Sequence, residues 1–145
     1  MTPRRSVGAT RTIAAPAPFI FNILAHAREH PLFDGSDSVR GVKDAPERLS
    51  LGATFTMKMK TGVPYFTRNV VVDFEKHRSI ARHHFARFVW RYDLEEVPGG
   101  TKVSESFTYE KPWAFLITWL GFPESNRRAM EASLERLERL ATSSH

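Results

Sequence analysis

An α+β fold is predicted, with a bent antiparallel sheet of six to seven strands wrapped around a long C-terminal helix. Three observations favour it. Between residues 39 and 110 most segments alternate apolar and polar side chains, which is the period of a half-buried strand. Short turns rich in glycine and proline separate these segments, as in an antiparallel meander. One long amphipathic helical pattern near the C-terminus is available to cover the apolar side of the sheet.

The N-terminal quarter predicts a strand followed by a helix. Residues 6–14 alternate weakly and are typical of a strand. Pro16 and Pro18 then begin a helix, because proline is tolerated in a first helical turn. Pro31 is expected to end this helix or to start a new turn, since the residue before a proline avoids the α region.

The central strands are assigned by alternation. In the run 55–60, Met57 lies on the inner face with Phe55 and Met59, whereas Lys58 and Lys60 lie on the outer face. The same argument over the next strand places four apolar residues inward: Phe66, Val70, Val72 and Phe74.

A hairpin is predicted around Pro98, Gly99 and Gly100, a strong turn signal between two alternating runs. Its first strand turns three residues inward: Trp90, Tyr92 and Leu94. Its second strand turns Val103, Phe107 and Tyr109 inward, with Glu105 between the first two.

The C-terminal helix is predicted from about Pro123 to Ala141. Met130, Leu134, Leu137 and Ala141 recur at helical spacing and form one apolar stripe. Four charged residues occupy the opposite face: Arg128, Glu131, Glu135 and Arg139. One side of this helix is therefore expected to be buried.

The chain has 145 residues, so we expect one domain spanning residues 1–145.

The composition excludes several classes of protein. The absence of cysteine excludes disulfides, a thiolate nucleophile and cysteine metal ligands. The N-terminus lacks the apolar run of a signal peptide, and the longest apolar stretch, 113–122, is too short to span a bilayer. A cytoplasmic protein without integral membrane association is therefore expected.

The net charge of +5 permits binding to nucleic acid, an anionic membrane or an acidic ligand. The basic residues are scattered along the chain, and no nucleic-acid-binding motif is recognisable. A nucleic-acid partner is therefore not expected.

Five segments in order resemble one known family: TRTIAAPAPFIFNILAHAREHPLFDGSDSV, LGATFTMKMK, NVVVDFEKHRSIA, WRYDLEEVPGGTKVSESF and PESNRRAMEASLERLERL. They are similar to the SRPBCC superfamily of START-related and pollen-allergen-like domains, and within it to the polyketide cyclase/dehydrase and lipid-transport group. Phe33 stands where many relatives carry tryptophan, a departure that should not disturb the fold. The resemblance implies a helix-grip fold with a cavity between sheet and final helix. It transfers no mechanism, because the family shares no universal catalytic residue.

Polar side chains on the inner face are the candidate site. His84 and Glu105 are the candidate catalytic residues, because each is a possible proton donor or acceptor. The candidate ligand-binding residues are Met57, Arg68, Val72, Arg82, Trp90, Tyr92, Phe107 and Met130. The alternatives are an internal Arg82–Glu105 ion pair, strand-end side chains that reach water, and a His84 satisfied by a backbone carbonyl.

Two further patterns have structural alternatives. His26 and His30 stand four residues apart on the predicted helix, a spacing that suits a shared metal, but a solvated helix end explains it as well. We expect neither a metal site nor a cofactor. The aromatic segment from Trp113 to Phe122 suits a lid over the cavity, a membrane contact, a homodimer contact or simply core.

The leading hypothesis is a domain that binds a small apolar or amphipathic ligand, of polyketide cyclase/dehydrase type. The first alternative is a carrier or sensor of lipids or small molecules without turnover. The second is an interaction protein whose basic surface meets an acidic partner or nucleic acid. The last predicts salt-sensitive binding through four basic residues: Lys58, Lys60, Arg87 and Arg91.

Overall fold

The structure is a computed structural model that describes residues 4–34, 39–61, 63–83, 89–110 and 122–142. Its elements in chain order are β1 (Arg4–Ile13), α1 (Ala17–Leu24), the 3-10 turn η1 (Ala27–Glu29), α2 (His30–Phe33), β2 (Val39–Lys43), β3 (Thr54–Thr61), β4 (Val63–Glu75), β5 (Ser79–His83), β6 (Val89–Val97), β7 (Gly100–Glu110) and α4 (Phe122–Thr142).

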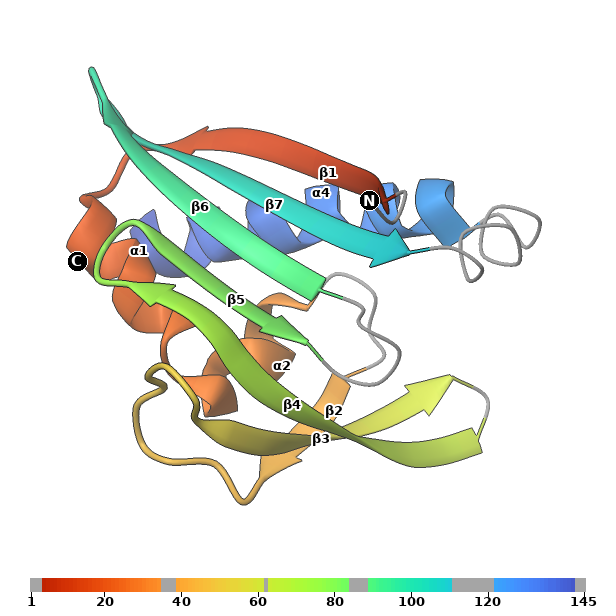
Figure 1. The fold of residues 1–145 in the computed structure, drawn as a ribbon. Helices are drawn as coiled ribbons and strands as arrows, with labels where there is room; N and C mark the ends of the chain where they lie inside the picture. The colour runs from red at the N-terminus through yellow and green to blue at the C-terminus, as the bar shows by residue number, and fades with distance from the viewer. Residues whose placement is uncertain (1–3, 35–38, 62, 84–88, 111–121, 143–145) are drawn as a thin grey trace.

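One seven-stranded sheet has the order β1-β7-β6-β5-β4-β3-β2 (Figure 1). All neighbouring strands pair antiparallel. Strands β2 to β7 form a meander, and its last strand, β7, pairs with β1 from the start of the chain. Gly100 begins β7 where the hairpin was predicted. A Cβ there would come within 2.1 Å of the Ile13 carbonyl oxygen, so this close approach requires glycine.

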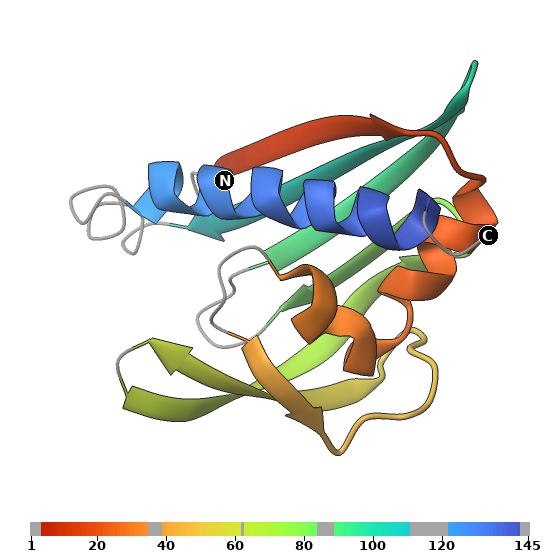
Figure 2. The ribbon, with the colours of Figure 1, turned by 180° about the vertical axis from the view of Figure 1, so that it is seen from behind.

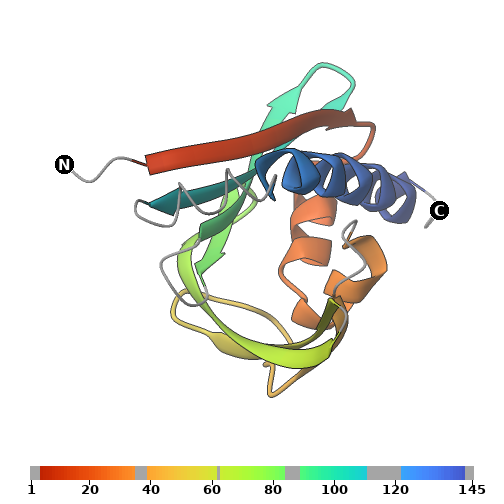
Figure 3. The same cartoon turned by 90° about the vertical axis from the view of Figure 1, so that its right-hand side faces the viewer.

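The sheet curls around the helices (Figures 2 and 3). The helix α4 runs along the concave side beneath β1 and β7, with α1 and α2 beside it. Its predicted stripe is confirmed, because Met130, Leu134, Leu137 and Ala141 are at most 1% exposed. Arg11 of β1 ties the strand to this helix, its Nε and Nη2 donating to Glu138 Oε1 at 3.0 and 2.9 Å. None of the described helices has the length and apolar character needed to span a bilayer.

The inner face of β3, β6 and β7 follows the predicted alternation. Met57 is 1% exposed, whereas Lys58 and Lys60 are exposed. Among the described side chains of β6 and β7, the buried ones are Tyr92, Leu94, Thr101, Val103, Glu105 and Phe107. The register of these three strands is therefore confirmed for the described side chains, whereas the side chain of Tyr109 lies outside them.

The predicted register of β4 is wrong over most of its length. Phe74 lies inside, its ring 5.2 Å from that of Phe21 on α1. A β-bulge between Val71 and Asp73 then shifts the alternation, so Val71 is buried and Val72 is 41% exposed. Thr67 and Asn69 consequently lie inward, and Phe66, at 61% exposed, lies outward.

The predicted helix after Pro16 divides into separate pieces. The helix α1 ends at Leu24, and His26 precedes η1, whereas His30 begins α2. The two histidines therefore do not share a helix, and the metal-binding spacing suggested by the sequence does not apply.

Leu134→Ala is expected to destabilise the fold by about 2–5 kcal/mol, because it leaves a cavity in the contact between helix and sheet. The free energy of unfolding, measured by urea denaturation, checks this. Glu135→Ala, one residue away on the exposed face, is the control and should change it by no more than about 0.5 kcal/mol. If Leu134→Ala and Leu137→Ala each lower the free energy of unfolding no more than the control does, the contact between α4 and the sheet is not the core of the fold.

Candidate functional site

A row of polar side chains crosses the apolar inner face of the sheet from β4 to β7. It consists of Asn69 on β4, Arg82 on β5, Trp90 and Tyr92 on β6, and Glu105 on β7. The strand register brings them together, because Arg82 pairs with Trp90 and Tyr92 pairs with Glu105 across neighbouring strands. We call these five residues the polar row. Polar groups are costly at such a position unless they find partners, so each contact is informative.

Glu105 is a buried carboxyl with one partnered oxygen. It is 1% exposed, and the indole Nε1 of Trp90 donates to its Oε2 at 2.7 Å. The other oxygen, Oε1, is buried and has no hydrogen-bond partner among the described residues. Burial raises the pKa of this carboxyl to about 8, although Trp90, Tyr92 and Arg82 favour the ionised form. At neutral pH Glu105 is therefore mainly protonated.

Arg82 has a neutral hydrogen-bond partner. Its Nη1 donates to Asn69 Oδ1 at 2.8 Å, and its guanidinium carbon lies 5.9 Å from the ring centroids of both Phe55 and Trp90. Burial lowers the pKa of Arg82, while Tyr92, Asp34 and Glu105 raise it. Among the described residues, no ion pair within 4.0 Å joins Arg82 to Glu105, so the internal pair considered as an alternative is not formed, and Arg82 bonds to Asn69 instead.

His30 is an interior histidine rather than a solvated one. It is 5% exposed, and its Nε2 lies 3.3 Å from the Leu24 carbonyl oxygen, which assigns the proton to Nε2. Its ring lies against Phe33 and Phe55 at centroid distances of 5.1 and 5.8 Å. Burial, together with the charge of Arg82, lowers the pKa of His30 to about 3, so the ring is neutral.

A small cavity lies beside the polar row. His30, Arg82, Trp90 and Tyr92 line it together with apolar residues from α1, β4 and β5. Its volume of about 10 Å³ has room for about one water molecule. A larger ligand needs these walls to move.

The site residues expected from the sequence fall into three groups. Seven lie in the interior, as expected: Met57, Arg82, Trp90, Tyr92, Glu105 and Phe107 on the inner face of the sheet, and Met130 on the buried side of α4. Arg68 and Val72 lie on the outer face, so their predicted place in the cavity lining is wrong, and the bulge in β4 is the reason. His84 lies outside the described residues, as does the segment from Trp113 up to residue 121.

Two members of the interior were missed. Asn69 is fully buried beside Arg82, and the assumed unbroken alternation of β4 had turned it outward. The burial of His30 was also missed, because the sequence around it, including Leu32 and Phe33, does not distinguish a buried ring from an exposed one. Within the described residues, no group of three or more His, Asp or Glu side chains is placed to hold a metal ion.

The arrangement presents hydrogen-bond donors within an apolar shell. The guanidinium of Arg82 donates, and a protonated Glu105 has one hydroxyl donor or acceptor to offer. Trp90 and Phe107, whose ring centroids are 5.0 Å apart, supply apolar contact area next to them. Such a surface suits an apolar molecule that carries an oxygen acceptor.

Comparison with known proteins finds relatives over almost the whole chain. A model of the family described as polyketide cyclase/dehydrase and lipid transport matches residues 4–142. An uncharacterized protein of Mycobacterium tuberculosis, present in strains CDC 1551 and H37Rv, is 34% identical over 132 residues. The match covers 86% of this chain and 59% of that protein, so the chain spans about three fifths of its length.

Solved structures agree on the fold. A crystallised protein from Mycobacterium smegmatis has a TM-score of 0.73 at 20% identity, covering 97% of this chain and 92% of that one. A protein of unknown function from Staphylococcus aureus has a TM-score of 0.75 at 6% identity, covering 99% and 96%. At these identities the likeness establishes the helix-grip architecture and nothing about ligands.

Glu105→Gln is expected to remove a pH dependence of stability. The pKa of about 8 in the folded protein exceeds the ordinary 4.5, so the folded state keeps a proton that the unfolded chain loses. The stability contributed by the neutral carboxyl is fully present below pH 4.5 and is lost as the pH rises to about 8. The free energy of unfolding of the wild type should therefore fall relative to that of the variant across this range.

Urea denaturation at a series of pH values measures the difference. Glu135→Gln, at an exposed position on α4, is the matched control and should follow the wild type. Parallel curves for wild type and Glu105→Gln would contradict the assignment of a protonated interior carboxyl.

Proposed function

The chain belongs to the polyketide cyclase/dehydrase and lipid-transport family of the SRPBCC superfamily, and on that premise we propose that it binds a small apolar ligand bearing an oxygen acceptor between sheet and α4. The observation that carries the proposal is the polar row. A buried carboxyl with one oxygen unpartnered among the described residues and a guanidinium bonded to a neutral amide both belong to this row, within a largely apolar interior.

The proposed site has an apolar part and a polar part, and each would bind a different part of the ligand. Trp90, Phe107 and Met57 offer contact area, which favours an apolar body by removing its surface from water. Arg82 and Glu105 offer donors to a carbonyl, carboxylate or hydroxyl oxygen at the other end. An aromatic or fatty molecule with one oxygenated end combines both features.

The small cavity is compatible with this proposal if the ligand opens it. Met57 and Met130 lie in the surrounding core at 1% and 0% exposure. Methionine side chains are unbranched and flexible, so they change shape at low cost when a guest enters. The energy of the opening is then part of the binding equilibrium.

Trp90→Ala is expected to weaken binding of an apolar fluorescent dye by about tenfold or more, because a large contact surface is lost. Displacement of the dye by fatty or aromatic acids measures the affinity. Lys58→Ala, on the outer face, is the control and should leave it unchanged at low and high salt. Loss of binding in Lys58→Ala but not in Trp90→Ala would contradict a ligand site in the interior.

Native mass spectrometry of protein purified from its own source would identify a retained ligand.

Arg82→Gln is expected to reduce the preference for an acid over an alcohol of the same chain length. Glutamine retains a donor near Asn69 but removes the positive charge, so the carboxylate should lose more affinity than the hydroxyl. The ratio of the two dissociation constants, measured by dye displacement, reports this. An unchanged ratio would show that Arg82 does not contact the polar end of the ligand.

A further inference from the structure

The outer face of β2, β3 and β4 carries a cluster of positive charge. Lys43, Lys58, Lys60 and Arg68 are all exposed. Residues 40–43, 54–60 and 64–72 contain no aspartate or glutamate. None of these four cations forms an ion pair with another described residue. They therefore form a local excess of positive charge.

The strand register makes this charge continuous. Thr56 of β3 pairs with Lys43 of β2 on one side and with Arg68 of β4 on the other. One row along, Lys58 pairs with Phe66. The Lys43 ammonium lies 4.5 Å from the Phe66 ring centroid and so joins the two rows.

Apolar side chains are exposed in the same place. The bulge in β4 leaves Phe66 61% exposed and Val72 41% exposed, with the half-buried Val70 between them. Large apolar residues on the solvent side of a strand interrupt the usual alternation, and such interruptions are expected at functional surfaces. We call Lys43, Lys58, Lys60, Phe66, Arg68 and Val72 the basic outer face.

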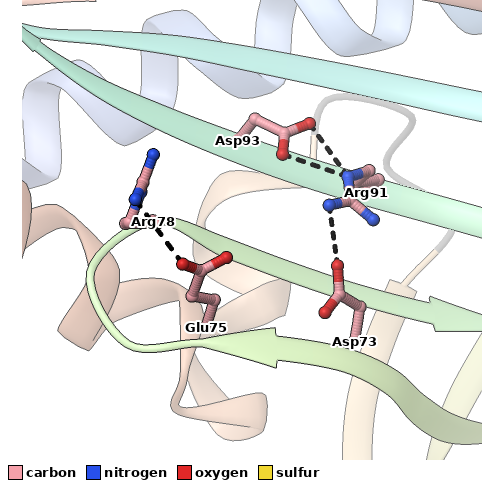
Figure 4. A network of polar contacts seen from close by, with 5 residues as sticks. All are labelled: Asp73, Glu75, Arg78, Arg91 and Asp93. Carbon is pink, nitrogen blue, oxygen red and sulfur yellow. Dashed lines mark hydrogen bonds and ion pairs between the residues drawn. The ribbon is translucent and has the colours of Figure 1, made fainter.

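The neighbouring part of the sheet differs. Arg91 on β6 bonds to Asp73 Oδ2 at 2.7 Å and to Asp93 Oδ1 at 3.0 Å, and Arg78 lies 3.6 Å from Glu75 (Figure 4). Arginines on that side of the outer surface are paired within the fold. The four clustered cations thus lie on β2, β3 and β4, the three strands at one end of the sheet (Figure 1).

We propose that the basic outer face docks on a lipid bilayer that contains anionic headgroups. Four cations attract such a surface, and Phe66 and Val72 can enter the headgroup layer. A second copy of the chain would bring like charges together, which disfavours self-association through this face. Sites for single-stranded nucleic acid stack successive bases on several aromatic side chains, whereas Phe66 is the one aromatic member of the basic outer face. The inference goes beyond the proposed function and does not depend on it.

Sedimentation with vesicles tests the proposal. The full chain should bind vesicles of phosphatidylcholine mixed with phosphatidylglycerol, and not phosphatidylcholine alone, with an affinity that falls as salt rises. The double variant Lys58→Gln, Arg68→Gln should lower the partition coefficient by about 30-fold, because each cation near an anionic surface contributes about 1 kcal/mol. Phe66→Ser should weaken binding while preserving its salt dependence.

The double variant Lys102→Gln, Arg139→Gln is the matched control, since it removes two exposed cations from β7 and α4. It should bind almost as well as the wild type. Equal losses in both double variants would reduce the effect to net charge and overturn the proposal, as would absence of wild-type binding. Tighter binding to a single-stranded oligonucleotide, lost in the Lys58, Arg68 variant, would reassign the face to nucleic acid.

Dye binding separates this outcome from that of the interior site. The outer-face variants should bind the apolar dye like the wild type, because none of the replaced residues lines the interior. Vesicle binding without dye binding would leave the membrane inference standing and remove the proposed function. Dye binding without vesicle binding would do the reverse.

Discussion

The alternation of side chains along β4 is interrupted once, at the bulge between Val71 and Asp73, and both faces of the sheet depend on it. Phe74 points inward, where its ring contacts the ring of Phe21 on α1. A strand with unbroken alternation from Phe74 would direct Arg68 into the core. The extra residue reverses the direction of every side chain before it, because the period of a strand is two. Asn69 enters the interior as a result.

The interior that this creates is polar where a core is normally apolar. Arg82 has an amide rather than a carboxylate as its hydrogen-bond partner, and Glu105 avoids the cost of a buried charge by keeping its proton. Trp90 links the apolar and polar parts, because its ring packs on Phe107 while its indole nitrogen bonds to Glu105. This combination is the chemical basis of the ligand class that we propose.

The same reversal shapes the outside of the molecule. Phe66, Arg68 and Val72 reach solvent on the strand whose inner side carries Asn69. The proposed ligand site and the proposed membrane surface therefore occupy opposite faces of β4. Substitutions on one face leave the contacts of the other intact, which makes the two proposals separable in the same protein.

The sequence by itself determined the elements that rest on local pattern. The turn before Gly100, the apolar stripe of α4 and the inward side of Met57 follow from spacing, since period and turn chemistry are properties of neighbouring residues. Family resemblance added the architecture. Tertiary structure alone decided the bulge in β4, the contact of Asn69 with Arg82 and the burial of His30. The residues on either side of a bulge keep an alternating pattern, so the sequence does not reveal where the side chains change face. The burial of a side chain is set by residues that are distant in the chain, so it is known only once the strands and helices are packed.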